Sequence, residues 1–358
     1  PTPRRAPIIP VFDGPNDLLY RLLDAPLRRE EIFLTGEGKG HLDLPRMRAA
    51  GFAGGFFAIY LPSPVAHDDT DHQAQMETPP YRLPLPEPLA QPGALVTATA
   101  LAGHLLWMER AGGGAFRICR TTADIRAAMQ AGAVAAIMHM EGAEAIDEDM
   151  DALHLFHAIG LRSLGPVWSR PTAFGHGVPF AFPSSPDTGP GLTEAGKRLV
   201  RECNALRIML DLSHLNGKGF DDVARISDAP LIATHSNAHA VTPSSRNLTD
   251  RQLATIRESG GMVGLNFSVS FLRQDGRRVA ETGWDPVLRH MDHLLENLGE
   301  DHLGFGSDFD GCTTPEVIGD VTGLPRLIEV LEAHGYDRAL LEKLAHGNWL
   351  RLLERVIG

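Results

Sequence analysis

The sequence predicts an α/β protein built as a single (β/α)₈ TIM barrel. Eight short apolar runs recur along the 358 residues, helical patterns separate several of them, and long inserts follow the second and fourth runs. Strands alternating with helices in one chain favour a parallel sheet with both faces covered, as in a closed barrel. A six-stranded open sheet is the main alternative, and the length alone also allows two ordinary domains.

The predicted strands are apolar on both faces instead of alternating, which is typical of parallel strands covered by helices. In chain order they are IIPVFDGPND, GFAGGFFAIYL, AVAAIMHMEG, LRSLGPVW, LRIMLDLSH, APLIATHSN, GGMVGLNFS and HLGFGSDFDG. Several of these runs end in polar residues.

The predicted helices carry start and stop signals. In LTEAGKRLVRECNALR, Thr193 is the expected N-cap of a helix with one apolar face. DEDMDALHLFHAIG begins with acidic residues and ends at Gly160, which suits the helix dipole and a C-cap. LTDRQLATIRESGG and DPVLRHMDHLLENLG repeat this scheme, and the chain from Asp337 to Val356 is expected to form a closing helix.

The two inserts are Pro-rich and cover residues 61–96 and 169–192. Both are expected on the C-terminal face of the barrel, where loops of this size usually shape a site. No linker clearly divides the chain, so residues 1–358 are predicted to form one domain.

The amino-acid composition limits the kinds of partner and the cellular compartment that we expect for this protein. Lys and Arg number 33 against 45 Asp and Glu, and no basic run is present, which argues against nucleic acid. Cys119, Cys203 and Cys312 are widely spaced and fit neither a disulfide framework nor a cysteine zinc site. No stretch approaches the roughly 20 apolar residues of a membrane span, and PTPRRAPIIP lacks the apolar core of a signal peptide. We therefore expect a cytoplasmic protein without membrane contact.

Five reactive residues stand at or just after the ends of predicted strands: Asp17, Glu141, His214, His235 and Asp308. Because these strand ends meet at one rim of a barrel, the five side chains should converge. Neighbouring strands lie ~4.8 Å apart, so His214 and His235 could both reach one ion with Zn–N bonds of about 2.0–2.1 Å. Closure of the eighth strand on the first should bring Asp308 beside Asp17.

This donor set predicts a metal site. Two histidines with several carboxylates suit Zn²⁺, or alternatively Mn²⁺ or Co²⁺, better than Mg²⁺ or Ca²⁺. The implied chemistry is metal-activated water attacking a carbonyl carbon. Two of these assignments have alternatives. His239 could bind the metal in place of His235. The segment with Asp308 and Asp310 could be an ordinary turn in which Asp310 caps a helix. His139 is a further candidate for a supporting or substrate-binding group, and Asp13 is expected to cap the first turn.

Together the motifs resemble the membrane (renal) dipeptidases, zinc barrels of the amidohydrolase type, and in particular their bacterial relatives. The resemblance runs along nearly the whole chain and includes FDG-ND near the N-terminus, GFAGGFFAIYLP, HMEGAEAI, LRSLGPVWSRPTAFGHGVPF, DLSHLN, ATHSNAHAV, RNLTDRQL, GMVGLNF, GFGSDFDG and HGNWLRLLE. It implies a (β/α)₈ fold, two zinc ions and hydrolysis of dipeptides, with tolerance for a C-terminal D-residue in many members. Homodimers are common in the family.

The resemblance also implies roles for individual residues. Glu141 would bridge the two metals, His214 and His235 would hold one of them, and Asp17 would hold the other. Asp308 corresponds to the family's catalytic acid/base. Arg246 corresponds to the group that grips the free carboxylate of the substrate, for which a planar guanidinium fork is well suited.

Two positions depart from the family pattern. The family opens with D-G-H-N-D, whose His binds the same metal as the Asp, but here Pro15 stands in its place and offers no donor atom. Trp168 replaces a His thought to polarise the scissile carbonyl, and its indole can donate one hydrogen bond but cannot take up a proton. That role would pass to His176, His139 or a backbone amide, or would be absent, and we expect Trp168 and His176 at the substrate site.

The sequence therefore predicts a zinc-dependent dipeptidase that acts on small dipeptides. Because Pro15 removes a ligand, one alternative is a barrel with a damaged metal site that serves as a binding protein. Another is a related amidohydrolase acting on a lactam, a lactone or another amide.

Overall fold

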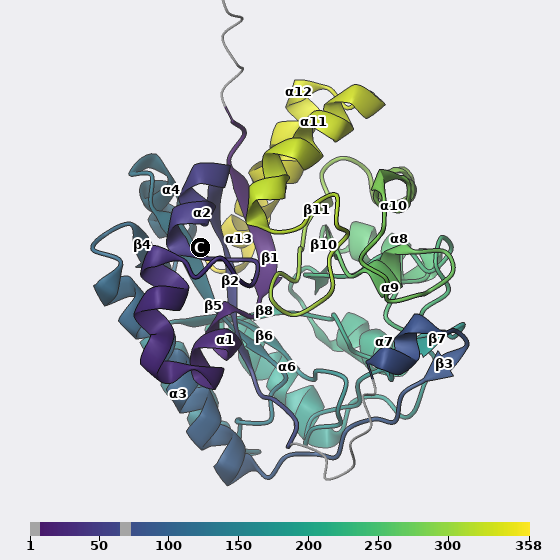
Figure 1. The fold of residues 1–358 in the computed structure, drawn as a ribbon. Coiled ribbons are helices and arrows are strands. Elements are labelled where there is room, and N and C mark those ends of the chain that lie inside the picture. The colour runs from purple at the N-terminus through teal and green to yellow at the C-terminus, as the bar shows by residue number, and fades with distance from the viewer. Residues whose placement is uncertain (1–7, 65–72) are drawn as a thin grey trace, which may run out of the picture.

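The computed structural model describes residues 8–64 and 73–358, in which helices surround a central group of strands (Figure 1). The described strands are β1 (Val11–Asn16), β2 (Phe52–Tyr60), β3 (Tyr81–Arg82), β4 (Phe116–Ile118), β5 (Val134–Glu141), β6 (Leu161–Gly165), β7 (Ala181–Phe182), β8 (Met209–Leu210), β9 (Ile232–Ala233), β10 (Met262–Leu265) and β11 (Leu303–Phe305). The described α-helices are α1 (Leu18–Asp24), α2 (Leu44–Ala50), α3 (Gln91–Ala111), α4 (Thr122–Gln130), α5 (Asp151–Ile159), α6 (Glu194–Leu206), α7 (Gly217–Ile226), α8 (Asp250–Glu258), α9 (Val269–Leu272), α10 (Trp284–Leu298), α11 (Leu324–His334), α12 (Arg338–Glu342) and α13 (Asn348–Val356). Shorter helical segments are η1 (Pro26–Arg28), η2 (Glu30–Thr35), η3 (Ala74–Glu77), η4 (Val321–Gly323) and η5 (Lys343–Gly347).

All eight predicted strands form, and they lie in two parallel sheets. One sheet runs in the order β1-β2-β5-β6-β8, and the other in the order β11-β10-β9. A parallel bridge joins Asp211, just after β8, to Ile232 in β9, and another joins Asn16 in β1 to Phe309, after β11. The α/β class with parallel strands is therefore confirmed. The sequence did not predict β4, which pairs with the first residues of β5.

Apolar side chains from both sheets share a buried cluster. It includes Phe12, Phe56, Ile137, Met209, Ile232, Met262 and Trp349, which come from β1, β2, β5, β8, β9, β10 and α13. A larger cluster fills the space between the strands and the surrounding helices. The strands are therefore buried on both faces, as their continuous apolar runs predicted.

The predicted helices form with the expected caps. The Thr193 side chain accepts a hydrogen bond from the backbone N–H of Gly196 at 3.0 Å, and Gly160 is the C-cap of α5. Thr249 and Gln252 form a reciprocal capping box at the start of α8. Over the described part of the chain, no helix combines the length and apolar character needed to cross a bilayer.

The closing segment after Asp337 is helical but not one regular α-helix, since η5 is a π-helical turn between α12 and α13. This turn directs two polar groups at the strand β11. Asn348 Nδ2 donates to the carbonyl of Leu303 at 2.7 Å, and Trp349 Nε1 donates to that of Phe305 at 3.0 Å. The tertiary contact with β11 accompanies the local change in helical period.

The two predicted inserts pack on one another. β3 in the first insert pairs antiparallel with β7 in the second. Behind this ribbon lies a small apolar cluster that also includes a residue of α9; its members are Met76, Tyr81, Leu83, Phe182 and Phe271. The two inserts therefore pack into an ordered wall beside the ends of the strands.

Asp13 does not cap a turn, so that expectation was wrong. It is fully buried in β1, and its carboxyl group accepts hydrogen bonds from the backbone N–H (2.9 Å) and the hydroxyl of Ser307. This contact ties β1 to the chain after β11. Pro15 is also buried in β1, where the register with β2 is irregular, and such an irregularity accommodates a residue that has no N–H.

Asp13 should make stability depend on pH. Burial raises the pKa of its carboxyl group from 3.8 to about 7, although Ser307 acts in the opposite direction. Between these values the folded chain binds a proton that the unfolded chain has released, so the free energy of unfolding falls as pH rises, by up to about 1.4 kcal/mol per pH unit. Urea unfolding between about pH 4 and about pH 8 should show this slope, and Asp13→Asn should reduce it. Equal slopes in both proteins would contradict the prediction.

Candidate active site

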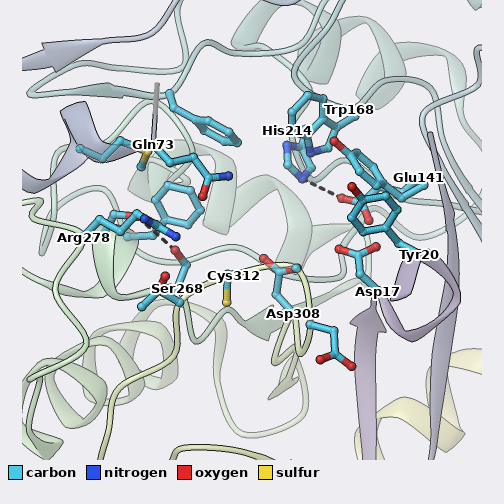
Figure 2. A pocket seen from close by; sticks show the side chains of 18 of the residues that line it. Asp17, Tyr20, Gln73, Glu141, Trp168, His214, Ser268, Arg278, Asp308 and Cys312 are labelled. Atoms are coloured by element: carbon cyan, nitrogen blue, oxygen red, sulfur yellow. Dashed lines mark hydrogen bonds and ion pairs between the residues drawn. The ribbon is translucent and has the colours of Figure 1, made fainter. Parts of the chain in front are cut away.

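A cavity of about 440 Å³ opens beside the strand ends (Figure 2). It is lined by Asp17, Glu141, Trp168, His214 and Asp308, which the sequence analysis singled out, and by residues of both inserts and of the chain after β10. The volume is that of a small-molecule site. The residues that approach from distant parts of the sequence therefore share one pocket.

Three possible ligand atoms converge at one end of this cavity. His214 Nε2 lies 2.9 Å from Glu141 Oε1 and 3.0 Å from His235 Nε2, and His235 Nε2 lies 3.4 Å from Glu141 Oε1. Two ligands bound tetrahedrally to one zinc ion are roughly 3.3 Å apart. All three side chains are buried. The spacing and the donor types therefore fit a metal ion.

Hydrogen bonds to the other ring nitrogens favour the same conclusion. Thr234 Oγ1 donates to Asp211 Oδ2, so it must accept the hydrogen bond from His235 Nδ1, which lies 2.8 Å away. His235 Nε2 is then free to act as a ligand. His214 Nδ1 lies 3.3 Å from Ser169 Oγ, and burial lowers the pKa of His214 to about 3, which keeps its ring neutral.

Electrostatics also favours a cation in the cluster. Burial alone would raise the pKa of Glu141 and lower that of His235, but hydrogen bonds with His214 and His235 lower the pKa of Glu141, and the contact with Glu141 raises that of His235. Burial, with the nearby charges of Glu141 and Asp308, raises the pKa of Asp17 well above its usual range. Asp17 Oδ1 is buried and has no hydrogen-bond partner. A bound cation would relieve the repulsion among these carboxylates.

Asp308 lies at the floor of the cavity between the two sheets. Asn266 Nδ2 donates to Asp308 Oδ2 at 3.2 Å, and burial raises the pKa of Asp308 to about 6. A Cβ atom at Gly311 would collide with both Asp17 Oδ2 and Asp308 Oδ1, so a larger residue there would displace these carboxylates. The backbone is held in the left-handed region at Asp308 (φ 60°) and at His214 (φ 68°), which is uncommon for these residues.

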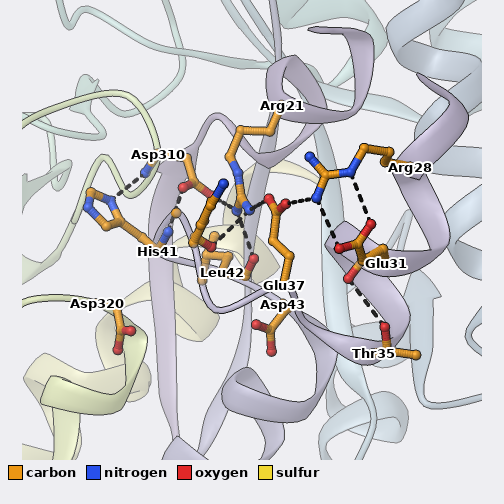
Figure 3. Close-up of polar contacts among 12 residues, drawn as sticks. Arg21, Arg28, Glu31, Thr35, Glu37, His41, Leu42, Asp43, Asp310 and Asp320 are labelled. Carbon is orange, nitrogen blue, oxygen red and sulfur yellow. Dashed lines mark hydrogen bonds and ion pairs between the residues drawn. The ribbon is translucent and has the colours of Figure 1, made fainter. Parts of the chain in front are cut away.

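A network of charged side chains fixes the turn that contains Asp308 (Figure 3). Asp310 accepts hydrogen bonds from the backbone N–H of His41 at 2.6 Å and from Arg21 at 3.0 Å. Its own backbone N–H donates to His41 Nδ1 at 2.8 Å, and Arg21 also donates to Glu37 at 2.9 Å. Asp310 therefore fixes the turn after β11 to the chain between α1 and α2 and does not cap a helix.

The three residues predicted to contact substrate lie in different environments. Trp168 lines the cavity, with its ring edge-on to Tyr60 at a centroid distance of 5.2 Å. Arg246 is buried and is not among the described residues that line the cavity; it donates to the carbonyl of His235 at 3.1 Å and to Ser236 Oγ at 3.3 Å. Its guanidinium lies over the ring of Phe271, which lines the cavity. His176 is not among the described residues that line the cavity, and its Nδ1 lies 3.3 Å from the carbonyl oxygen of Gly191.

The remaining alternatives also have definite positions. His239 Nε2 lies 2.8 Å from the carbonyl oxygen of Ser184, away from the cluster that His235 joins. His139 is buried, with Nδ1 2.8 Å from Ser163 Oγ.

Sequence reasoning missed Asp211, Thr234 and Asn266, although all three are polar residues at the ends of apolar runs. Their position at the ends of these runs is the signal that could have identified them.

The chain was compared with known proteins. A model of the membrane dipeptidase family (peptidase family M19) matches residues 6–357. The chain is 69% identical to a metallopeptidase from Rhodobacter sphaeroides whose crystal structure contains a phosphinate mimic of the dipeptide L-Ala-D-Ala; the TM-score is 0.96, over 98% of this chain and 100% of that one. It is 67% identical to the crystal structure of dipeptidase AC, a metallopeptidase of family M19, with a TM-score of 0.94 and coverage of 98% and 100%.

A further relative comes from Klebsiella pneumoniae, where it is described as an uncharacterized protein in the pqqA 5′ region. It is 51% identical over 243 residues, which are 68% of this chain and 90% of that protein. The family match over almost the whole length and the high identity to solved members agree with the geometry of the cavity. The chain therefore belongs to the membrane dipeptidase family, peptidase family M19.

Proposed function

We propose that this protein is a zinc-dependent dipeptidase that also accepts dipeptides with a C-terminal D-residue. The observation that carries the proposal is the convergence of Glu141, His214 and His235, two of which line the cavity together with Asp308. The relative from Rhodobacter sphaeroides, which was solved with a mimic of L-Ala-D-Ala, supports the choice of substrate.

The proposed metal centre uses the residues expected from the sequence. His214 and His235 would hold one zinc ion, Asp17 would hold a second, and Glu141 would bridge them. Bound zinc would supply Lewis-acid activation of water and polarisation of the substrate carbonyl. The unpaired oxygen of Asp17 and the short distances within the His–Glu cluster support this arrangement.

The protein's own residues would position the substrate and move its protons. Asp308, with its raised pKa, would accept a proton from the attacking water and pass it to the leaving amine. Arg246 would hold the free carboxylate; its Nε is buried without a hydrogen-bond partner, and its guanidinium lies over Phe271, which lines the cavity. Trp168 would form a wall of the pocket, and its indole N–H is the donor it can offer there. His176, in the second insert, would act in substrate binding only through a movement of that insert.

The test of this proposal combines metal analysis with activity. Because Pro15 offers no donor, the ion at Asp17 should bind more weakly than the ion at the two histidines. Pro15→His should raise the metal content from near one equivalent towards two and should increase dipeptide hydrolysis. Elemental analysis and turnover of a dipeptide panel with Zn²⁺, Mn²⁺ and Co²⁺ would check this, with chelated protein as the control. Two tightly bound metal equivalents in the unaltered protein would contradict the weak binding expected at Asp17. No dipeptide hydrolysis with any of the three ions would contradict the proposed dipeptidase function.

We further propose that residues 1–358 form one closed (β/α)₈ domain. The bridges at both junctions of the two sheets and the buried cluster shared by their strands support closure. The free thiols of Cys119, Cys203 and Cys312 support a cytoplasmic location. The family resemblance is the basis for proposing a homodimer.

A further inference from the structure

The cavity wall that faces the His–Glu cluster carries a guanidinium group. Arg278 lies across the cavity from Glu141 and Trp168 (Figure 2). Among residues 8–64 and 73–358, it is the one Lys or Arg side chain that lines this cavity, and it makes no hydrogen bond or ion pair through its side chain. A half-buried cation without a partner in a substrate pocket is suited to bind an anion.

The position of Arg278 is fixed by the surrounding chain. Its backbone N–H donates to the carbonyl of Met76 in the first insert at 2.9 Å. The neighbouring arginines have partners, since Arg277 Nε donates to the carbonyl of Glu77 at 2.9 Å and Arg273 pairs with Asp275 at 2.6 Å. The Arg278 side chain alone among these three faces the cavity. Its free guanidinium is therefore a feature of the pocket wall.

Two hydroxyl groups line the cavity on the same side. Ser268 Oγ and Ser270 Oγ lie 3.1 Å apart, and Figure 2 shows Ser268 beside Arg278. Hydroxyl groups donate hydrogen bonds to the carboxylate oxygens that a guanidinium does not reach. This side of the pocket therefore offers both a positive charge and additional donors.

Charge is distributed unevenly around the cavity, and this orients a zwitterionic dipeptide. Four carboxyl side chains line it, those of Asp17, Glu141, Asp308 and Asp310. Figure 2 shows Asp17 and Glu141 at the end away from Arg278. Bound metal would compensate the charges of Asp17 and Glu141, whereas Arg278 keeps its positive charge at the other end, so the negatively charged C-terminal part of a dipeptide is drawn towards Arg278.

The two guanidiniums differ in their relation to the cavity, since Arg278 lines it and Arg246 is buried beside it. Arg246 contacts the carbonyl of His235, so it lies beside the metal-binding end. The α-carboxylate of a dipeptide is about one residue length, ~3.8 Å, from the scissile carbonyl carbon and must be held near that end. Arg278 lies across the cavity from Glu141, so it is placed for a group that extends further along the C-terminal side chain.

We propose that Arg278 binds the side-chain carboxylate of an acidic C-terminal residue, so that the enzyme prefers dipeptides ending in Asp or Glu. This inference rests on the proposed dipeptidase function, with Arg246 as the group that holds the α-carboxylate. Ser268 and Ser270 complete the anion site by hydrogen bonding.

The test compares isosteric substrates in the metal-loaded enzyme. L-Ala-Asp and L-Ala-Asn, each in the L and D series at the second residue, differ only in the charge of one side chain. Steady-state kcat and KM would be measured for the unaltered enzyme, Arg278→Ala, Arg278→Lys and Arg277→Ala. Arg277 is the matched control, because it is the adjacent arginine and does not line the cavity.

The unaltered enzyme should favour Ala-Asp over Ala-Asn by about tenfold or more in kcat/KM. Arg278→Ala should raise KM for Ala-Asp about 10- to 100-fold and leave Ala-Asn nearly unchanged, Arg278→Lys should retain part of the preference, and Arg277→Ala should retain all of it. Equal use of both substrates by the unaltered enzyme would overturn the inference. So would an equal loss on both substrates in Arg278→Ala, which would assign Arg278 to the α-carboxylate or to the fold. Hydrolysis of neither substrate nor any other dipeptide would instead overturn the proposed function.

Discussion

His235→Ala is expected to remove most of the bound metal and to lower kcat/KM by at least about a thousandfold. The substitution takes away a ring nitrogen that lies 3.0 Å from His214 Nε2 and 3.4 Å from Glu141 Oε1. Without it, the remaining two residues of the cluster cannot hold an ion tightly. The loss should appear both in elemental analysis and in dipeptide turnover.

His239→Ala is the matched control for this experiment, because the two histidines are four residues apart on the same segment. His239 contacts the carbonyl of Ser184 and lies outside the cluster of possible ligands. This variant should keep its metal and most of its activity. Equal metal loss in both variants, or none in His235→Ala, would show that the ligand set is wrong.

Asp308→Asn is expected to lower kcat by about 10²- to 10⁴-fold while leaving the metal content unchanged. Asparagine preserves the size of the side chain and can still contact Asn266, but it cannot accept the proton of an attacking water. Metal analysis, circular dichroism and kcat would be measured on the same preparations. A kcat within about twofold of the unaltered enzyme would remove Asp308 from the proton transfer.

The control for this change is Asp301→Asn, which makes the same replacement at the opposite end of β11. Asp301 is exposed and pairs with Lys343 and Arg351 at the surface. Its replacement should leave kcat and metal content unaltered, because surface ion pairs contribute little. A comparable loss in both variants would indicate damage to β11 rather than loss of a proton acceptor.

Local patterns in the sequence were sufficient to locate the strands and the reactive residues at their ends. Continuous apolar runs marked all eight strands, since a parallel strand covered on both faces needs no polar side. The polar residues that follow these runs must then meet at one edge, which is why Asp17, Glu141, His214 and Asp308 could be placed in one pocket from sequence. β4 was missed because its exposed Arg117 interrupts the apolar run of this short strand.

The sequence patterns could not show which partner each polar residue contacts. Asp13 and Asp17 are close in sequence, yet Asp13 accepts hydrogen bonds from Ser307 and Asp17 faces the cavity. Arg246 and Arg278 are both arginines in irregular segments, but Arg278 lines the cavity and Arg246 is buried against the carbonyl of His235. These differences depend on contacts between segments far apart in the chain.

The sequence by itself determined the α/β class, the order of the strands, the family resemblance and the set of residues that converge. These follow from local burial patterns and from the rule that parallel strands end at one edge. Only the tertiary structure decided that His235 and not His239 joins the His–Glu cluster, that Thr234 and Asp211 orient its ring, and that Arg278 completes the pocket wall. The physical reason is that hydrogen-bond partners and cavity walls are supplied by packing between distant segments, which no local pattern records.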